Sequence, residues 1–324
     1  MKILVTGGLG FIGSNFIKYV AENYPEDELV NLDKKTYAAS PIAESELAKN
    51  RNYKAVRGDI CDKELVRSIT VGVDAIVNFA AETHVDRSIS DSHPFAVTNV
   101  LGTLNLLEAA RTNDVQRFHH VSTDEVFGSL RLDSMEKFSE STNYNPRNPY
   151  SASKASSDFF VRAYHETYGQ KTTITNCSNN FGPYQHPEKL IPKSILNLLN
   201  DEHVPIYGDG KNIRDWLYVE DHCSAIDLAL RKGKSGETYC ISAANELSNL
   251  EIINMILEFL EKDRSLIQFV PDRPGHDRRY SLDASKIMNE LGWKPRSDFR
   301  TSLGKTVDWY KHNRSLILSS YKVV

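Results

Sequence analysis

Short apolar runs alternate with longer amphipathic segments through the first half of the chain. The strand-like runs cover residues 2–8, 28–34, 54–60, 75–82 and 117–123. Residues 14–24 and 99–113 have the spacing of helices and lie between such runs. Because the runs are nearly continuous in apolar residues, both faces of each strand should be covered. The alternation therefore predicts βαβ units and a parallel sheet.

A long helical pattern at residues 150–168 ends at Gly169, and a strand-like run follows at 171–179. Beyond residue 178, loops rich in Pro, Gly, Asn and Asp separate shorter helices. We expect an α/β protein with a Rossmann-type doubly wound parallel sheet and a second, smaller α/β domain that binds substrate. The expected boundaries are 1–178 for the first domain, with 214–243 returning to it, and 179–213 and 244–324 for the second.

Composition narrows the classes of partner. The chain has 324 residues and a net charge of −4, which gives no overall attraction to nucleic acid or to acidic membranes. No apolar run approaches the roughly 20 residues that span a bilayer. The N-terminal "MKILVTGG" lacks the features of a secretory signal, so we expect a cytoplasmic protein. Four distant cysteines without a C-x-x-C pair predict reduced thiols and no metal site: Cys61, Cys177, Cys223 and Cys240.

A glycine pattern separates the first predicted strand from the first predicted helix. Gly7, Gly10 and Gly13 allow a sharp turn and a close approach of the backbone to a pyrophosphate at a helix N-terminus. Asp33 lies 20 residues beyond Gly13 and closes the second strand. A carboxylate there accepts hydrogen bonds from the ribose hydroxyls and repels a 2′-phosphate, which predicts NAD rather than NADP. The neighbouring Lys34 and Lys35 weigh against this choice, because a cation tolerates the phosphate.

Tyr150 and Lys154 lie four residues apart on one face of a helix that begins near Pro149. Taken alone, they could be an ordinary exposed pair. A phenol has a pKa of about 10 and is a poor base unless positive charge lies nearby. Lys154 and an oxidised nicotinamide would supply that charge. After a dinucleotide-binding pattern, we interpret the pair as catalytic.

The segment Ser122-Thr-Asp-Glu125 has two interpretations. It fits a helix capping box, with Ser122 as the N-cap and Glu125 reaching back. Alternatively, Asp124 and Glu125 divide acid and base roles, as two carboxyls do when their environments separate their pKa values.

Several motifs resemble the extended short-chain dehydrogenase/reductase family, whose members act on nucleotide-sugars. They are "TGGLGFIGS", "RGDI", "NFAAETHVDRS", "YSASKA" and "RDWLYVEDH", and the resemblance extends over nearly the whole chain. Within this family, "STDEVFG", "NCSNNFGPYQHPEKLIP" and "RPGHDRRY" are similar to the branch of dTDP-glucose 4,6-dehydratases. Phe127 and Phe181 depart from that branch, where tyrosine is usual, which puts hydrogen bonds around the site in doubt.

The resemblance implies an NAD-dependent lyase, a dTDP-glucose substrate and a homodimer formed by a helix bundle of residues 99–110 and 150–168. The implied catalytic residues are Thr123, Asp124, Glu125, Tyr150 and Lys154. The expected cofactor-binding residues are Gly7, Gly10, Phe11, Ile12, Gly13, Asp33, Lys34, Thr36, Asp59, Ile60, Phe79, Ala80, Ala81, Thr98, Ser122, Tyr150, Lys154 and Asn180. The expected substrate-binding residues are Thr83, His84, Asp86, Thr123, Asn179, Glu188, Lys189, Leu190, Pro205, Tyr207, Arg214, Asn249, Arg273, His276 and Tyr280.

Such a reaction explains why two carboxyls are needed. Oxidation at C4 of the hexose makes the C5 proton removable, and Tyr150 takes the C4 hydroxyl proton. We expect Glu125 to be the base at C5 and Asp124 the acid for the departing C6 hydroxyl, and the hydride returns to C6. A nucleotide-sugar epimerase or decarboxylase would not need this pair. A non-catalytic NAD sensor should have lost Tyr150 or Lys154, and this chain has both. Asp33 and the "PEKLIP" stretch weigh against a GDP-mannose dehydratase.

Overall fold

The computed structural model describes residues 1–272 and 277–321. Its largest feature is a sheet of seven strands in the order β10-β6-β5-β4-β1-β2-β3. Every neighbouring pair is parallel. The strands are β1 (Lys2–Thr6), β2 (Glu28–Asp33), β3 (Tyr53–Arg57), β4 (Ala75–Asn78), β5 (Arg117–Thr123), β6 (Thr172–Cys177) and β10 (Thr238–Ile241). This strand order confirms the predicted Rossmann-type doubly wound sheet.

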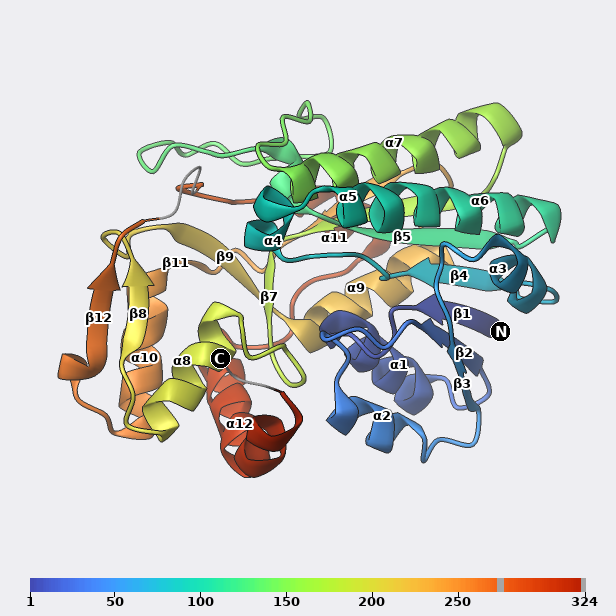
Figure 1. Cartoon of the computed structure of the whole chain (residues 1–324). Helices are drawn as coiled ribbons and strands as arrows, with labels where there is room; N and C mark the ends of the chain where they lie inside the picture. Colours follow the sequence, from blue (N-terminus) through green and yellow to red (C-terminus); the bar gives the residue numbers. More distant parts are fainter. Residues whose placement is uncertain (273–276, 322–324) are drawn as a thin grey trace.

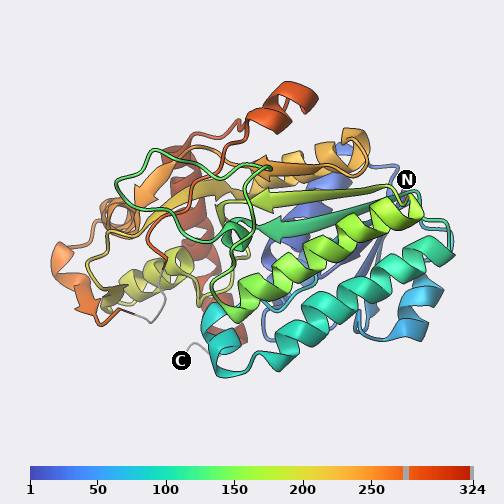
Figure 2. The ribbon, with the colours of Figure 1, turned by 90° about the horizontal axis from the view of Figure 1, so that it is seen from above.

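Helices cover both faces of the sheet because its strands are apolar on both sides (Figures 1 and 2). On β1, Leu4 belongs to a core shared with Leu106 and Val161, whereas Val5 belongs to one shared with Ile226 on the opposite face. The first face carries α3 (Lys63–Ile69), α6 (Thr103–Thr112) and α7 (Pro149–Tyr168). The second carries α1 (Phe11–Asn23), α2 (Pro41–Leu47) and α9 (Val219–Lys232).

The helix expected at residues 99–113 is not a regular α-helix along its whole length. A short helix α5 (His93–Phe95) leads into a π-helix η1 (Ala96–Gly102), and only then does α6 begin. Asn99 lies in the π-helical part. Its Oδ1 accepts a hydrogen bond from the Glu82 N–H at 2.8 Å, and its Nδ2 donates to the Glu82 carbonyl at 3.0 Å and to Ser153 Oγ at 2.8 Å. A π-turn points this side chain at the loop after β4, and such bulges often occur at functional sites.

The second half of the chain builds a smaller region beside the sheet (Figure 1). Strand β9 (Ile213–Tyr218) pairs in parallel with β7 (Asn179–Phe181) and antiparallel with β11 (Glu246–Ser248). Strands β8 (Val204–Tyr207) and β12 (Ile267–Val270) form a parallel pair. A separate apolar core joins α8 (Leu190–Leu199), α10 (Asn249–Leu260) and α12 (Phe299–Ser320). The remaining elements are α4 (Val85–Ser90), the 3₁₀-helices η2 (Asp124–Phe127) and η3 (Arg264–Leu266), and α11 (Ser285–Leu291).

The chain returns to the large sheet between these pieces. Strand β9 stays in the smaller region, α9 packs against α1, and β10 adds to the edge of the large sheet at β6. The return therefore begins at Val219 rather than at residue 214. The expected domain boundaries otherwise stay a prediction.

The four cysteines are free thiols; Cys61 is half-buried and the other three are buried. Within residues 1–272 and 277–321, no group of three or more His, Cys, Asp or Glu side chains could hold a metal ion. Among the same residues, no helix is both long and apolar enough to cross a membrane.

Candidate active site

A cavity of about 350 Å³ lies where the parallel strands end. Because strands β1 to β6 run in one direction, the residues that follow them meet at one edge of the sheet, where open α/β sheets bind their ligands. All of the expected cofactor-binding residues line this cavity. Their binding roles stay a prediction.

The turn between β1 and α1 requires glycine for two reasons. Gly7 has a φ of +69°, and a Cβ there would lie 2.8 Å from the Cα of Ala80. A Cβ on Gly13 would lie 2.4 Å from the Gly7 carbonyl oxygen. No side chain caps the start of α1, where Gly10 is the N-cap. The backbone N–H groups of the first turn therefore face the cavity as an anion site.

Gly7 and Gly72 allow a matched test of this turn. Both have left-handed backbones, with φ of +69° and +68°, but a Cβ on Gly72 would meet nothing within 4 Å. We expect Gly72→Ala to cost about 1–2 kcal/mol of folding free energy through φ alone. Gly7→Ala should cost a further ~1–3 kcal/mol through the clash and lose bound dinucleotide. Denaturant unfolding and the nucleotide content of purified protein measure both effects. Equal losses would contradict the close approach.

Asp33 holds its carboxylate at the cavity through backbone donors. The N–H groups of Leu9 and Lys35 donate to its two oxygens at 2.9 and 2.7 Å. Burial raises the pKa of Asp33, and these two donors oppose the rise. Lys34 pairs with Asp59 at 2.7 Å, and Lys35 pairs with Glu44. Both neighbouring cations therefore already face carboxylates, which favours NAD over NADP.

One of the two interpretations of residues 122–125 was a helix capping box, and the structure shows that it is wrong. Strand β5 ends at Thr123, and η2 begins at Asp124. The cap is Thr123, whose hydroxyl accepts from the Glu125 N–H at 3.3 Å. Ser122 instead donates to Asp158 at 2.8 Å. The Glu125 carboxylate accepts from Asn148 Nδ2 at 3.4 Å rather than from the backbone of the cap.

Asp124 and Glu125 occupy different environments. Burial, and then the neighbouring Glu125, raise the pKa of Asp124 well above its usual range. Burial also raises the pKa of Glu125, but the hydrogen bond from Asn148 and the charges of Arg214 and Lys189 oppose it. Asp124 Oδ1 accepts from Thr123 at 3.2 Å, and Oδ2 has no hydrogen bond among the described residues. Asp124 is therefore the more readily protonated carboxyl, and Glu125 the one more readily ionised and so available as a base.

Helix α7 places Tyr150 and Lys154 beside this pair. Asn148 caps the helix in a capping box with Ser151, at 2.8 and 3.2 Å. The Thr123 hydroxyl lies close enough to the Tyr150 phenol to lower its pKa, but burial followed by Glu125 raises the pKa of Tyr150 well above 10. Burial lowers the pKa of Lys154 to about 8. The arrangement joins a phenol, a hydroxyl and a carboxyl in one contiguous chain.

Comparison with known proteins agrees with this geometry. Residues 4–306 match the family described as GDP-mannose 4,6 dehydratase. The dTDP-glucose 4,6-dehydratase of Mycobacterium tuberculosis is 47% identical over 97% of this chain and 95% of its own length. The chain belongs to the dTDP-glucose 4,6-dehydratase family. The low-salt glycan biosynthesis protein Agl12 of Haloferax volcanii is 51% identical over 96% of this chain and 98% of its own.

Solved structures place the chain in the same family. The dTDP-glucose 4,6-dehydratase DesIV of Streptomyces venezuelae, with NAD and TYD bound, has a TM-score of 0.94, 48% identity and 98% coverage of both chains. A UDP-glucose 4-epimerase of Thermotoga maritima has a TM-score of 0.90 at 28% identity, covering 97% of this chain and 100% of its own. The fold alone therefore does not separate this dehydratase family from epimerases.

The expected substrate-binding residues fall into three groups. Five line the cavity: Thr83, Thr123, Asn179, Glu188 and Lys189. Eight lie outside its lining: His84, Asp86, Leu190, Pro205, Tyr207, Arg214, Asn249 and Tyr280. Arg273 and His276 lie outside the described residues. Each of these binding roles remains a prediction.

Two residues outside the lining, His84 and Arg214, interact with charged groups of the lining. His84 lies 3.5 Å from Glu188. Arg214 lowers the pKa of both Asp124 and Glu125, and its guanidinium lies 4.4 Å from the ring centre of Tyr280. Arg214 therefore supplies positive charge next to the carboxylate pair.

Arg278 and Arg279, in the motif "RPGHDRRY", both contact other residues of the protein. Arg278 pairs with Asp209 at 3.2 Å. Arg279 is buried and donates to Glu246 at 2.7 Å and to the Glu136 carbonyl at 2.9 Å. Both are tied to the protein itself, as structural arginines would be.

The two departures from the family pattern do not lie in the cavity lining. The Phe127 ring stacks on Phe138 at 5.3 Å and meets Tyr144 edge-on at 5.2 Å. The Phe181 ring lies 5.2 Å from Phe299. Both rings are buried in apolar clusters, so a hydroxyl at either position would belong to the packing around the site.

Sequence reasoning missed several residues of this site. Glu82, Cys177, Gln185 and His186 line the cavity, and Asn148 contacts Glu125. Gln185 and His186 lie inside the motif "NCSNNFGPYQHPEKLIP", close in sequence to Glu188, which was expected to bind substrate. For Asn148, a polar residue before Pro149 is a capping signal that could have been read.

Proposed function

We propose that this protein is a dTDP-glucose 4,6-dehydratase that holds NAD in the cavity at the strand ends and converts dTDP-glucose to dTDP-4-keto-6-deoxy-glucose and water. The observation that carries this proposal is the adjacent pair of carboxyls, the buried Asp124 and the half-buried Glu125, which lies beside Thr123 and Tyr150. An epimerase on the same fold has no elimination step and no use for the pair.

The residues of the cavity fit a dinucleotide. Gly7, Gly10 and Gly13 leave room at the start of α1 for a pyrophosphate, and Asp33 accepts from an adenosine ribose. Bound NAD⁺ would accept a hydride from the sugar and later return it. Lys154 and Tyr150, both on α7, lie in the same lining. A nicotinamide ribose bound there would contact them.

Tyr150 acts first, as the base that removes the C4 hydroxyl proton. Burial opposes its ionisation, so the phenolate needs nearby positive charge. Lys154 and the nicotinamide cation supply it. The Thr123 hydroxyl, which lies near the phenol, would donate to the sugar oxygen or to the phenol.

Glu125 and Asp124 then perform the elimination. The ketone at C4 makes the C5 proton acidic, and Glu125, the more readily ionised carboxyl of the two, removes it. Asp124, which burial keeps protonated, donates to the C6 hydroxyl, which leaves as water. Each placed group contributes roughly 10²- to 10⁴-fold in rate.

Proton accounting assigns a further task to Thr123. At the end of a turnover, Glu125 has returned its proton to C5, Tyr150 has gained one from C4, and Asp124 has lost one to water. The next turnover requires a proton on Asp124 and none on Tyr150. The Thr123 hydroxyl donates to Asp124 at 3.2 Å and lies near the Tyr150 phenol, so it offers the direct path for this reset.

The function is tested by incubating the purified protein with dTDP-glucose and no added NAD. We expect a product lighter by one water that develops the chromophore of a 4-keto-6-deoxy sugar in alkali. Denaturing the enzyme should release NAD. Release of NADP alone would refute the role of Asp33, and a C4-inverted sugar without loss of water would refute the dehydratase.

We also propose a homodimer through η1, α6 and α7, with dTDP-glucose and NAD bound in each subunit. The helices α6 and α7 lie side by side on one face of the molecule (Figure 2). Apolar side chains remain exposed along them and η1: Leu101, Phe159, Phe160 and Tyr168. Such a patch on helices marks an interaction site.

Introducing a charge into this patch should separate the subunits. Phe159 is 54% exposed, and Phe159→Glu would bury an unpaired carboxylate in the proposed interface. We expect light scattering to report about half the wild-type mass for this variant. Val71→Glu, at a turn where the side chain is 62% exposed, is the control and should leave the mass unchanged. A wild-type monomer would refute the proposal.

A further inference from the structure

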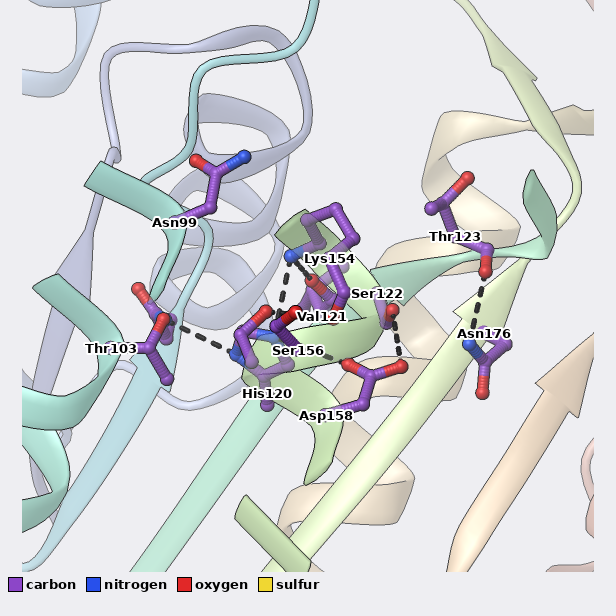
Figure 3. A network of polar contacts seen from close by, with 12 residues as sticks. Asn99, Thr103, His120, Val121, Ser122, Thr123, Lys154, Ser156, Asp158 and Asn176 are labelled. Atoms are coloured by element: carbon purple, nitrogen blue, oxygen red, sulfur yellow. Dashed lines mark hydrogen bonds and ion pairs between the residues drawn. The ribbon is translucent and has the colours of Figure 1, made fainter. Parts of the chain in front are cut away.

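Behind the catalytic lysine lies a buried polar cluster that the proposed chemistry does not use. Helix α7 carries Asp158 one turn beyond Lys154, on the same face. His120 on β5 lies opposite both side chains (Figure 3). All three residues are at most 4% exposed. Burying two charges and an imidazole is costly unless they satisfy one another.

The contacts arrange the three groups around one nitrogen. His120 Nε2 lies 3.3 Å from Lys154 Nζ and 3.4 Å from Asp158 Oδ1. Lys154 Nζ also donates to the Val121 carbonyl at 2.8 Å. Asp158 Oδ2 accepts from Ser122 and Tyr144, both at 2.8 Å. Because Oδ2 is occupied, Oδ1 is the oxygen that lies next to the imidazole.

A chain of hydrogen bonds through the sheet determines which imidazole nitrogen carries the proton. Thr6 Oγ1 donates to Asn78 Oδ1 at 2.6 Å. The Asn78 amide nitrogen therefore is the donor to Thr103 Oγ1 and to His120 Nδ1, both at 3.2 Å. His120 Nδ1 is thus an acceptor, and the neutral ring has its proton on Nε2, facing Asp158. His120 cannot accept a proton from Lys154 at that nitrogen.

Asp158 is consequently the negative charge that balances Lys154. The titratable groups facing Lys154 are Tyr150 and Asp158 from α7, His120 from β5 and Cys177 from β6. Burial raises the pKa of Tyr150 well above 10 and that of Cys177 to about 12, and it lowers the pKa of His120. These three are neutral at pH 7. Among the facing groups, Asp158 raises the pKa of Lys154 most and Cys177 raises it less, while burial lowers it.

We propose that Asp158 is the buried counterion that keeps Lys154 protonated when a nicotinamide cation enters the cavity, and that His120 positions its carboxylate. The inference rests on the proposed function for the identity of that cation. A second positive charge near Lys154 in a low-dielectric site favours loss of the lysine proton. A fixed carboxylate behind the lysine opposes that loss. His120 and Asp158 act through Lys154 and are positioning residues.

The test measures the lysine directly. In full-length enzyme labelled with ¹⁵Nζ-lysine, the Lys154 resonance is assigned by its absence in Lys154→Met and is titrated with pH. Asp158→Asn keeps the side-chain shape but removes the charge, and it should lower the pKa of Lys154 by about 1–3 pH units. Asp158→Glu should restore at least half of that shift.

His119→Gln is the matched control, because His119 is a buried histidine on the same strand. It bonds to Thr173 and Thr175 at 2.8 and 3.1 Å rather than to Lys154. We expect this variant to leave the pKa of Lys154 unchanged. A shift in His119→Gln as large as that in Asp158→Asn would show that the effect is general damage to β5, and would overturn the proposal.

Two further measurements keep the proposal falsifiable. If Asp158→Asn does not fold, the double variant Lys154→Met/Asp158→Asn should fold, because neither charge then remains buried alone. A double variant as unstable as the single one refutes the pairing. In the pH profile of NAD⁺ reduction, the alkaline limb should move to lower pH as the pKa of Lys154 falls. The titration needs no substrate, so a wild-type enzyme without dehydratase activity would refute the function while leaving the counterion result intact.

Discussion

Tyr150→Phe is expected to slow the reduction of NAD⁺ by dTDP-glucose by about 10²- to 10⁴-fold, with little change in substrate affinity. The substitution removes only the phenolic oxygen, which lies near the Thr123 hydroxyl and would take the C4 proton. The ring can keep its edge-on contact with Phe95, where the centroids lie 6.4 Å apart. Absorbance of the reduced nicotinamide in a single turnover measures the rate, and equilibrium binding of dTDP measures the affinity.

Tyr144→Phe provides the matched control. Tyr144 is a second tyrosine with a buried hydroxyl, which donates to Asp158 at 2.8 Å and not to the Thr123 segment. Its loss should change NAD⁺ reduction by about tenfold or less, because Ser122 still donates to the Asp158 carboxylate and the lost hydrogen bond lies outside the reacting atoms. Near-normal turnover of Tyr150→Phe would show that another group is the base at C4.

Asp124→Asn and Glu125→Gln are expected to block the reaction at different points after the same first oxidation. Asp124→Asn should reduce NAD⁺ and exchange the C5 proton with solvent, but should lose water about 10²- to 10⁴-fold more slowly, because no acid serves the C6 hydroxyl. Glu125→Gln should reduce NAD⁺ but neither exchange C5 nor eliminate. The different environments of the two carboxyls are the reason for this division.

Isotopes separate these outcomes. NMR in D₂O measures exchange at C5, and mass spectrometry measures the loss of water. In the wild type, deuterium placed at C4 of the substrate should appear at C6 of the product, because the same hydride leaves and returns. Glu136→Gln, an exposed carboxylate beyond η2, is the control and should behave as the wild type. Deuterium recovered at C4 of an inverted sugar would contradict the dehydratase.

Local patterns were sufficient to predict much of the fold. The strand β5 was expected at residues 117–123 and is found there, and α7 was expected within one residue of its observed start. Continuous apolar runs report burial on both faces of a parallel strand, whatever the rest of the chain does. The glycine turn was predictable for a similar reason, because Gly13 contacts Gly7 and Gly8 within the first βαβ unit, whereas the contact of Gly7 with Ala80 comes from the loop after β4.

Other features follow from contacts that no local pattern encodes. The π-helix at Ala96–Gly102 depends on Asn99 reaching Glu82 and Ser153. The start of the return to the large sheet, at Val219 rather than residue 214, depends on β9 pairing with β7 and β11. These partners lie 17 to 54 residues away from Asn99, or on separate strands, so spacing along the chain carries little trace of them.

The sequence by itself determined which chemistry the chain can perform: a dinucleotide turn, a Tyr150–Lys154 pair on one helical face and two adjacent carboxyls are all local patterns. Only the tertiary structure decided how those groups divide the work. Burial raises the pKa of Asp124 above its usual range, and Asn148 and Arg214 temper that of Glu125. His120 Nε2 lies close to both Lys154 Nζ and Asp158 Oδ1 because β5 and α7 pack together. The pKa of a group depends on which charges and how much water surround it in space, and the fold brings those surroundings together from distant parts of the chain.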